Sequence, residues 1–421
     1  MKWNSGFNVT ELLSAVSKSR TLQDTGSVSY GHFGVPDYWR SILETAIIDE
    51  TVPESVKSAA IAKAMNSSQT LSISSFKAAY HEHKRKLQDR QKTWLVVYPL
   101  WGQIKLLQNR YKSEDVSIDF NPSENTKVFT EVIHNRAEQR KSFKSGFENT
   151  FEEIANYKLC FARTKASDPE TAQNTTQKAL DEVLGCTNFW SSHGSNWRMY
   201  SGIQRPISRI LVAPHITIHG LKGSLAYPGF YYHQWYPKNY FNAEPNEQKH
   251  RSIKKATKLT FEKIHELPDK WRPNALKALR LYNQAFSQHN PQDAFMLGWQ
   301  VLETIAGFKN SNHDRIIRRA AGFFTTRSEM TALGQHLKLR RNMYSHSGEV
   351  STQFGDTLAH QIKSLIEPMM RHYLANPFKF SSEEEFWQFC DVSSEENSRE
   401  RTLYILNCAD KFHSPTENTG G

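Results

Sequence analysis

The segment at residues 337–348 brings together side chains that can cleave or hold a phosphodiester. It contains Arg341, Asn342 and His346. A guanidinium stays charged at any physiological pH and matches the geometry of phosphate oxygens, and an imidazole exchanges protons near neutral pH. Asparagine adds a neutral donor and acceptor that can orient the phosphate. These residue types therefore indicate phosphate chemistry.

The spacing of the arginine and the histidine is a weak signal by itself. The chain contains 17 histidines and 53 lysines and arginines, so similar pairs arise by chance. Arg209 and His215 form one such pair, but they flank the apolar run at residues 210–213, which is typical of a buried strand. The setting of Arg341 is different, because helical patterns surround it.

Four apolar stripes at helical spacing around Arg341 predict an all-helical bundle. They occupy residues 274–286, 295–305, 316–323 and 358–369. The segment that contains Arg341 forms a further helix of this bundle. These helices must position the three side chains.

Arg341 lies on the apolar face of its own helix, together with Leu333, Leu337 and Tyr344. A lone guanidinium that points into a bundle is costly unless something pairs with it. We therefore expect Arg341 to line a cleft, to meet an acid such as Glu303, or to face a second chain.

Two structural explanations compete with a catalytic one. Arg341 could serve only as the ion-pair partner of Glu303. Gly348 suits a helix C-terminus, and a histidine near such an end favours the helix dipole, so His346 could be a capping residue. The sequence leaves both explanations open, but the joint presence of arginine, asparagine and histidine favours an active site.

The residues in this part of the chain resemble an Apea-like HEPN domain. The resemblance rests on the order of the helices, the Leu-Gly-Trp-Gln-Val-Leu-Glu-Thr-Ile segment at residues 297–305, and Arg341-Asn342 followed by His346. It covers residues 255–376. It implies a metal-independent endoribonuclease without a cofactor, whose site forms between the protomers of a homodimer. The ribose 2′-OH attacks the scissile phosphate, and a 2′,3′-cyclic phosphate is left.

The resemblance also implies a role for each residue. His346 would exchange a proton with the attacking or leaving oxygen, an effect of about 10²–10⁴-fold. Arg341 would hold the charge that builds on the phosphoryl oxygens. The implied catalytic residues are Arg341, Asn342 and His346, and the supporting residues are Glu303, Arg340 and Tyr344.

The implied setting is a regulated toxin or an anti-phage defence effector, because the family is associated with both. The main alternative is a catalytically silent HEPN module that only dimerises or binds RNA. A phosphate-transfer enzyme with an accessory HEPN domain would depend on metal. A partner-binding antitoxin would keep its cellular effect when Arg341 and His346 are substituted.

The composition indicates a basic, globular protein. The 421 residues include 53 basic and 43 acidic side chains, a formal net charge of +10, and 38% hydrophobic residues. This length suits two or three domains with a sizeable core, and the charge favours a polyanionic partner such as RNA. For the two lysines among the expected RNA contacts, a solvated linker is an equally good interpretation. The expected RNA-binding residues are Lys254, Lys255, Arg315, Arg318 and Arg319.

The cysteines and the hydropathy pattern bear on location. The four cysteines, at positions 160, 186, 390 and 408, form no closely spaced pair, so they signal neither a zinc ribbon nor a disulfide framework. No apolar run reaches the roughly 18 residues of a membrane helix, and residues 1–5 lack a signal-peptide pattern. We therefore expect reduced thiols in the cytoplasm, no metal and no membrane partner.

The helical and strand patterns in the N-terminal two-thirds of the chain predict a mixed α+β domain. A polar stretch at residues 165–178 separates its strands, which argues against a repeating βαβ unit. The fold class that we predict is an α+β N-terminal domain followed by an all-α, HEPN-like helical bundle. Helices are expected at residues 36–49, 53–65 and 74–91, and strands at residues 93–100, 157–161 and 207–213.

Four regions follow from these patterns. The α+β region has no assigned role beyond sensing a trigger or selecting substrate. The regions are a helical part at residues 1–92, the α+β domain at 93–250, the HEPN-like bundle at 255–376 and an acidic helical tail at 377–421.

The α+β region holds two weak candidate sites. His215 begins one His-x-Thr-apolar arm of the kind that two-histidine phosphoesterases use in pairs, but no second arm follows. His215 and His219 would share a strand face, and two histidines without a third ligand make a weak zinc site. The aromatic residues at 231–241 could stack on bases, although packing in a core is the favoured role.

Overall fold

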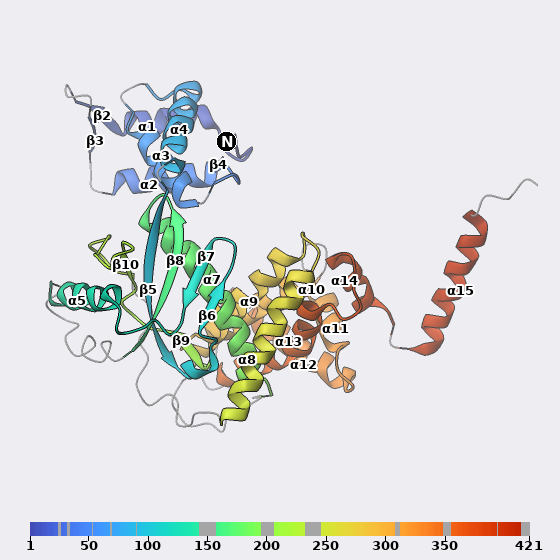
Figure 1. Ribbon diagram of the computed structural model, residues 1–421. Coiled ribbons are helices and arrows are strands. Elements are labelled where there is room, and N and C mark those ends of the chain that lie inside the picture. The colour runs from blue at the N-terminus through green and yellow to red at the C-terminus, as the bar shows by residue number, and fades with distance from the viewer. Residues whose placement is uncertain are drawn as a thin grey trace, which may run out of the picture. The chain divides into compact units, whose positions relative to one another are not determined.

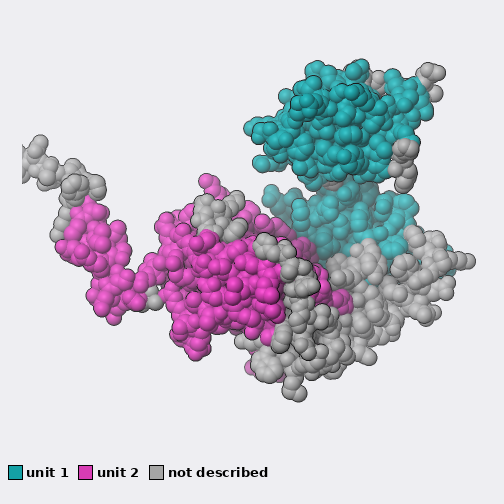
Figure 2. Space-filling view, turned by 180° about the vertical axis from the view of Figure 1, so that it is seen from behind, with its two compact units in different colours: residues 1–101, 108–180, 212–236 teal, residues 102–107, 181–211, 237–421 magenta. Residues whose placement is uncertain are grey.

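The computed structural model contains two compact units, shown in different colours in Figure 2. Unit 1 consists of residues 1–101, 108–180 and 212–236, and unit 2 of residues 102–107, 181–211 and 237–421. A mixed α/β region precedes an all-helical region, as predicted (Figure 1). The structure describes residues 1–23, 27–31, 34–52, 54–67, 70–89, 91–142, 157–194, 206–231, 246–307, 312–347, 355–393 and 395–413.

Helices at the start of unit 1 enclose a small core of their own. The core includes Leu13, Leu43, Ile61 and Phe76, all buried. Three of the helices confirm those predicted at residues 36–49, 53–65 and 74–91. The helices are α1 (Val9–Lys18), α2 (Val35–Ala46), α3 (Glu54–Met65) and α4 (Ile73–Gln88).

The predicted helix at residues 36–49 ends earlier than expected. Ile47 and Ile48 form β4 (Ile47–Ile48), which pairs antiparallel with β1 (Lys2–Trp3). Both residues are β-branched, and such side chains favour strands over helices. A second antiparallel pair joins β2 (Arg20–Leu22) to β3 (Val28–Tyr30).

An antiparallel sheet forms a second part of unit 1. Its strands run in the order β10, β5, β8, β7, β6. The antiparallel pairing agrees with the expected α+β class, because parallel strands need long crossover connections. The strands are β5 (Lys92–Gly102), β6 (Arg110–Lys112), β7 (Val116–Asp119), β8 (Lys158–Ala166) and β10 (Thr217–His219); β9 (Ile210–Val212) belongs to the same sheet, and a short 3-10 helix, η1 (Ile104–Leu106), follows β5.

One helix, α5 (Lys127–Ser142), packs on a face of this sheet. Leu95, Val97 and Phe161 supply the buried sheet residues of that contact. They stand on one face because Val97 pairs with Phe161 across the ladder and Leu95 lies two residues before Val97. Val128, Phe129 and Val132 face them from α5.

The long helix α7 (Pro169–Ser191) is absent from the sequence prediction, which left residues 165–178 as a polar stretch. Asp168 starts this helix, because its Oδ1 accepts a hydrogen bond from the backbone N–H of Thr171 at 2.8 Å. Thr176 is fully buried although it is polar, and its hydroxyl donates to the carbonyl of Ala172 at 2.8 Å. Buried polar side chains of this kind interrupt the repeat of apolar residues from which a helix is predicted.

Unit 2 is a helical bundle around one apolar core. Leu279, Trp299, Leu302 and Ile362 are all buried in it. The helices predicted from the four apolar stripes and the motif segment are all present. The elements are α8 (Glu247–Glu266), α9 (Arg272–Phe286), α10 (Pro291–Ala306), α11 (His313–Ala321), α12 (Arg327–Ser347), α13 (Gly355–Ala375), α14 (Glu383–Asp391) and α15 (Glu396–His413).

The structure places α14 in the bundle core, whereas the sequence placed it in an acidic tail. Phe386 and Cys390 are buried with the residues of α9 and α13. Three acidic residues open α14, where a helix N-terminus stabilises negative charge. That local cause explains the acidic composition. The described residues of α15 are mostly exposed.

A buried ion pair lies within the core of unit 2. Lys363 and Glu367 are one turn apart on α13, and their Nζ and Oε1 atoms are 2.6 Å apart. Lys363 also donates to the carbonyl of Ser192 at 2.7 Å. Burial lowers the pKa of Lys363, and the neighbouring Glu367 opposes that shift. Each of the two buried charges is therefore compensated by the other inside the core.

None of the helices in the described ranges is both long and apolar enough to cross a lipid bilayer.

Candidate functional site

The motif residues lie on α12, which packs closely against α11. Gly334 makes this approach possible, because a Cβ atom at that position would overlap the side chain of Ile317. Leu337, one turn further on, is fully buried, as predicted for the apolar stripe. This packing fixes α12 in the bundle ahead of Arg341.

Arg341 is partly exposed and lies beside an acid. Its Nη2 atom is 3.9 Å from Oε1 of Glu303 on α10, and its side chain is 28% exposed. Of the three settings expected for Arg341, the structure therefore shows the one beside an acid, Glu303. A separation of 3.9 Å is longer than a hydrogen bond. The contact is therefore an electrostatic one and not a bidentate pair of hydrogen bonds.

Glu303 is held by two further residues that the sequence did not single out. Trp299 Nε1 donates to Oε1 of Glu303 at 2.8 Å, and His313 Nε2 lies 3.4 Å from the same oxygen. The ring of His313 meets the Trp299 ring edge-on, with centroids 5.6 Å apart. Trp299 lies one turn before Glu303 on α10, so only helical spacing could have indicated this contact.

The other motif residues continue along α12. Arg340, Asn342 and Tyr344 are each partly exposed. His346 belongs to the last turn of α12, but its side chain lies outside the described part of the structure. Helical geometry separates positions 341 and 346 by about 7.5 Å along the axis and about 140° around it. The two positions therefore lie on different faces of α12.

Two large apolar side chains next to the motif are open to solvent. Leu339 is 62% exposed and Met343 is 51% exposed. They are four residues apart and so occupy neighbouring places on one face of α12. Exposed apolar pairs of this kind mark interaction surfaces more often than single exposed residues do.

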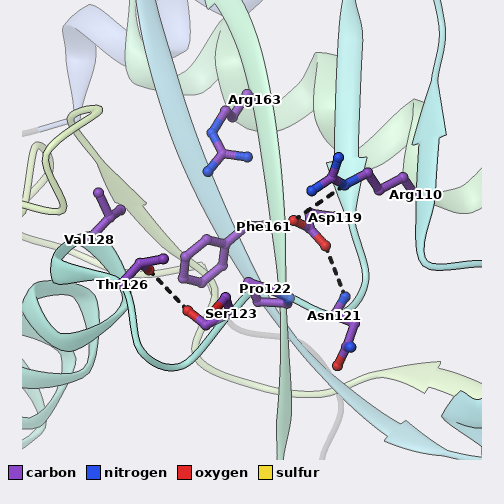
Figure 3. A pocket seen from close by; sticks show the side chains of 9 residues that line it. All are labelled: Arg110, Asp119, Asn121, Pro122, Ser123, Thr126, Val128, Phe161 and Arg163. Atoms are coloured by element: carbon purple, nitrogen blue, oxygen red, sulfur yellow. Dashed lines mark hydrogen bonds and ion pairs between the residues drawn. The ribbon is translucent and has the colours of Figure 1, made fainter.

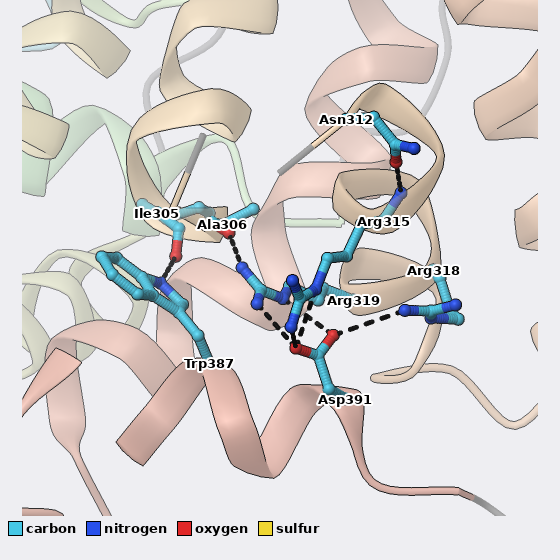
Figure 4. A network of polar contacts seen from close by, with 8 residues as sticks. All are labelled: Ile305, Ala306, Asn312, Arg315, Arg318, Arg319, Trp387 and Asp391. Carbon is cyan, nitrogen blue, oxygen red and sulfur yellow. Dashed lines mark hydrogen bonds and ion pairs between the residues drawn. The ribbon is translucent and has the colours of Figure 1, made fainter. Parts of the chain in front are cut away.

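The arginines expected to bind RNA on α11 share an acidic partner in the chain itself (Figure 4). Nη2 of Arg315 and Nη2 of Arg319 each lie 2.6 Å from Oδ2 of Asp391 on α14. Arg318 Nη2 is 3.7 Å from Oδ1 of the same carboxylate. Arg319 is buried and also donates to the carbonyl of Ala306. Its position is that of a structural residue.

The network sets the protonation of Asp391. Burial raises the pKa of this carboxyl, but the hydrogen bonds and charges of Arg319 and Arg315 outweigh burial and lower the pKa to about 2. Asp391 therefore stays charged at neutral pH. Arg318 is exposed and Arg315 is partly exposed, so contact with RNA at these two stays a prediction.

The two lysines in the RNA prediction lie on α8. Lys255 is exposed, and Lys254 is partly exposed. Lys258, one turn after Lys254, is also exposed and lies 3.7 Å from Glu262. The structure therefore provides a helix face for these lysines, where the sequence allowed a linker.

The two histidines of unit 1 are buried in a polar network. His215 Nε2 lies 2.9 Å from Gln139 Oε1, and His219 Nε2 lies 2.9 Å from Thr217 Oγ1. Arg136, itself buried, donates to Thr217 Oγ1 at 2.6 Å. Burial lowers the pKa of His215 to about 2 and that of His219 to about 4, and the charge of Arg136 adds to both shifts.

This environment argues against both weak candidate sites in unit 1. The imidazoles of His215 and His219 have no exposed surface, so a phosphodiester has no access to them. Across the described ranges, no three His, Cys, Asp or Glu side chains lie together in a way that could hold a metal ion. Among the aromatic residues at 231–241, Tyr231 is partly exposed, and residues 232–241 lie outside the described part.

The cysteines are all free thiols. Cys160, Cys186 and Cys390 are buried, and Cys408 is exposed. Burial raises the pKa of Cys186 to about 12 and that of Cys390 to about 12, so these thiols stay protonated.

Comparison with known proteins yields no relative: the chain matches no protein-family model, no curated protein and no solved structure.

Proposed function

We propose that this protein is a metal-independent endoribonuclease of the HEPN type, which cuts RNA at the motif on α12. The observation that carries the proposal is the placement of Arg341. Its guanidinium is partly exposed on a helical bundle and lies beside Glu303 of α10. Arg341 shares α12 with Asn342 and His346. A sealed internal ion pair would have argued against catalysis, and Arg341 is not sealed.

The proposed reaction is an internal transesterification. The ribose 2′-oxygen attacks the phosphorus, the bond to the 5′-oxygen breaks, and a 2′,3′-cyclic phosphate remains. An imidazole at position 346 accepts the proton of the 2′-OH or supplies one to the leaving 5′-oxygen. Arg341 stabilises the negative charge on the phosphoryl oxygens, and Asn342 orients the phosphate.

A second copy of the chain completes the proposed site. Positions 341 and 346 lie about 140° apart around α12, so a single helix does not present both to one phosphate. Leu339 and Met343 offer an exposed apolar face beside the motif. Pairing of two such faces buries that apolar surface and brings the arginine of one chain toward the histidine of the other.

The experiment is cleavage of a labelled, mixed-sequence RNA by the purified full-length chain in EDTA. The proposal predicts products with 2′,3′-cyclic phosphate ends and no cleavage of the same sequence made with 2′-O-methyl ribose. Arg341→Ala should lower the rate by about 10² or more, which is typical when a charge-stabilising donor is removed. Arg327→Ala, at the start of the same helix, serves as the matched control and should keep the rate.

The ion pair between Arg341 and Glu303 favours a second candidate, a silent scaffold that dimerises or binds RNA. The same assay separates the two functions. Binding of RNA without cleavage, unchanged by EDTA or added Mg²⁺, would support the scaffold. Cleavage that needs Mg²⁺ would instead support a phosphate-transfer enzyme.

A further inference from the structure

Unit 1 contains a small cavity that lies outside the proposed nuclease site (Figure 3). Its volume is about 200 Å³. The side chains around it come from three neighbouring strands and from the start of α5. They are Arg110, Asp119, Asn121, Pro122, Ser123, Thr126, Val128, Phe161 and Arg163.

The register of the sheet explains why these residues meet. Arg110 on β6 pairs with Asp119 on β7, and Asp119 pairs with Phe161 on β8. Residues that pair directly across strands point to the same face, so the three side chains form a row. Arg163 follows Phe161 by two residues and therefore shares that face. In Figure 3 the Phe161 ring lies between Arg163 and the loop before α5.

The start of α5 forms the opposite wall. Thr126 Oγ1 accepts a hydrogen bond from the N–H of Phe129 at 3.2 Å, which makes Thr126 the cap of this helix. The first backbone N–H groups of an α-helix have no acceptor within the helix itself. A helix N-terminus carries a partial positive charge. The wall therefore adds a polar donor beside the arginines.

The charges around the cavity are unequal. Asp119 Oδ2 lies 3.9 Å from Arg110 Nε, and Asp119 Oδ1 accepts from the N–H of Asn121 at 3.1 Å. The carboxylate is thus partly compensated. Arg163 has no acidic partner within the described ranges, and it is partly buried. A guanidinium in such a setting is stabilised by an anion.

A third cation lies just behind the lining. Lys158 Nζ donates to Oδ1 of Asn121 at 2.7 Å. The lining itself thus contains two guanidiniums and one carboxylate, and the side chain of Arg110 is largely exposed. The hydroxyl of Ser123 adds a further donor. The two lining cations come from β6 and β8.

We propose that this cavity binds the phosphoryl group of a small phosphorylated ligand. Arg163 would contact the phosphoryl oxygens, as guanidiniums do in two-point contacts. Arg110, Ser123 and the first turn of α5 complete the set of donors. Phe161 is almost fully buried, so it serves as an apolar floor and leaves no stacking surface for a base. This inference does not depend on the nuclease activity proposed for unit 2.

The test is calorimetric titration of the full-length chain with inorganic phosphate, with a nucleoside 5′-monophosphate and with malonate. We expect both phosphorylated probes to bind and malonate to bind at least about tenfold more weakly. Tighter binding of the nucleotide would place the natural source among phosphate esters, and equal binding would point to free phosphate. Equal affinity for malonate, or no binding of either phosphorylated probe, would overturn the proposal.

Variants of β8 link the binding to the cavity. Arg163→Gln should weaken phosphate binding by about tenfold to a hundredfold, the usual effect of losing a charge-assisted hydrogen bond. Lys165→Gln removes an exposed charge from the same strand outside the cavity and should leave the affinity unchanged. Arg163→Lys should keep part of the affinity, which separates loss of charge from loss of fold. Equal affinity of the Arg163→Gln protein would refute the assignment.

Discussion

We expect the carboxylate of Asp391 to be the main polar contact that holds α14 to Arg315 and Arg319 of α11. The substitution Asp391→Asn tests this expectation. The substitution keeps the shape of the side chain but removes the charge that faces Arg319, which is 5% exposed. A carboxyl whose pKa falls from 3.8 to about 2 contributes about 2.5 kcal/mol. Removal of one partner from a buried pair costs about 3–5 kcal/mol. We therefore expect a loss of about 3 kcal/mol.

The pH dependence has a defined sign. Because the pKa of Asp391 is lower in the folded protein, its stabilisation is fully present above about pH 4 and is lost as the pH falls toward 2. The difference in stability between the wild type and Asp391→Asn should therefore shrink over that interval. At neutral pH the difference should be at its largest.

Hydrogen exchange of α14 peptides, read together with urea denaturation, is the suitable assay. Asp314→Asn is the matched control, because Asp314 is 52% exposed and pairs with Lys338 at the surface at 2.8 Å. Such a pair contributes about 1 kcal/mol or less. If Asp391→Asn changes the protection of α14 against hydrogen exchange no more than Asp314→Asn does, the structural role of Arg315 and Arg319 is refuted.

Three further outcomes follow from the packing and the charges. Gly334→Ala should destabilise unit 2 by about 1–3 kcal/mol, because the new methyl group meets Ile317, and in thermal unfolding the double variant with Ile317→Ala should lose less than the sum of the two single losses. Lys363→Met should cost about 3–5 kcal/mol in urea denaturation by leaving Glu367 buried without its partner, and the double variant with Glu367→Leu should be closer to the wild type. Glu303→Gln should lower kcat for RNA cleavage about tenfold with little change in folding, because the contact that positions the motif guanidinium weakens; an unchanged kcat would assign Glu303 a structural role only.

The sequence predicted most of the helices of unit 2, because each carries an apolar stripe at helical spacing. It also offered Glu303 as one possible partner of Arg341, and the two side chains lie 3.9 Å apart. The sequence did not predict α7, because buried polar residues such as Thr176 interrupt its pattern.

Other contacts depend on residues far apart in the chain. Asp391 lies 72 residues after Arg319, and no local pattern indicates that the two meet. Likewise the cavity in unit 1 depends on the register that sets Arg110 beside Asp119 and Phe161. Strand register is a property of the folded sheet, and periodicity within one strand does not specify it.

The most direct test of the central claim compares two histidines of α12 in RNA cleavage. His346→Ala should lower the cleavage rate in EDTA by about 10²–10⁴-fold, the range expected for loss of a general acid or base. His336→Ala, an exposed histidine on the same helix, should leave the rate unchanged. An equal rate for the His346→Ala protein and the wild type would contradict catalysis at this motif.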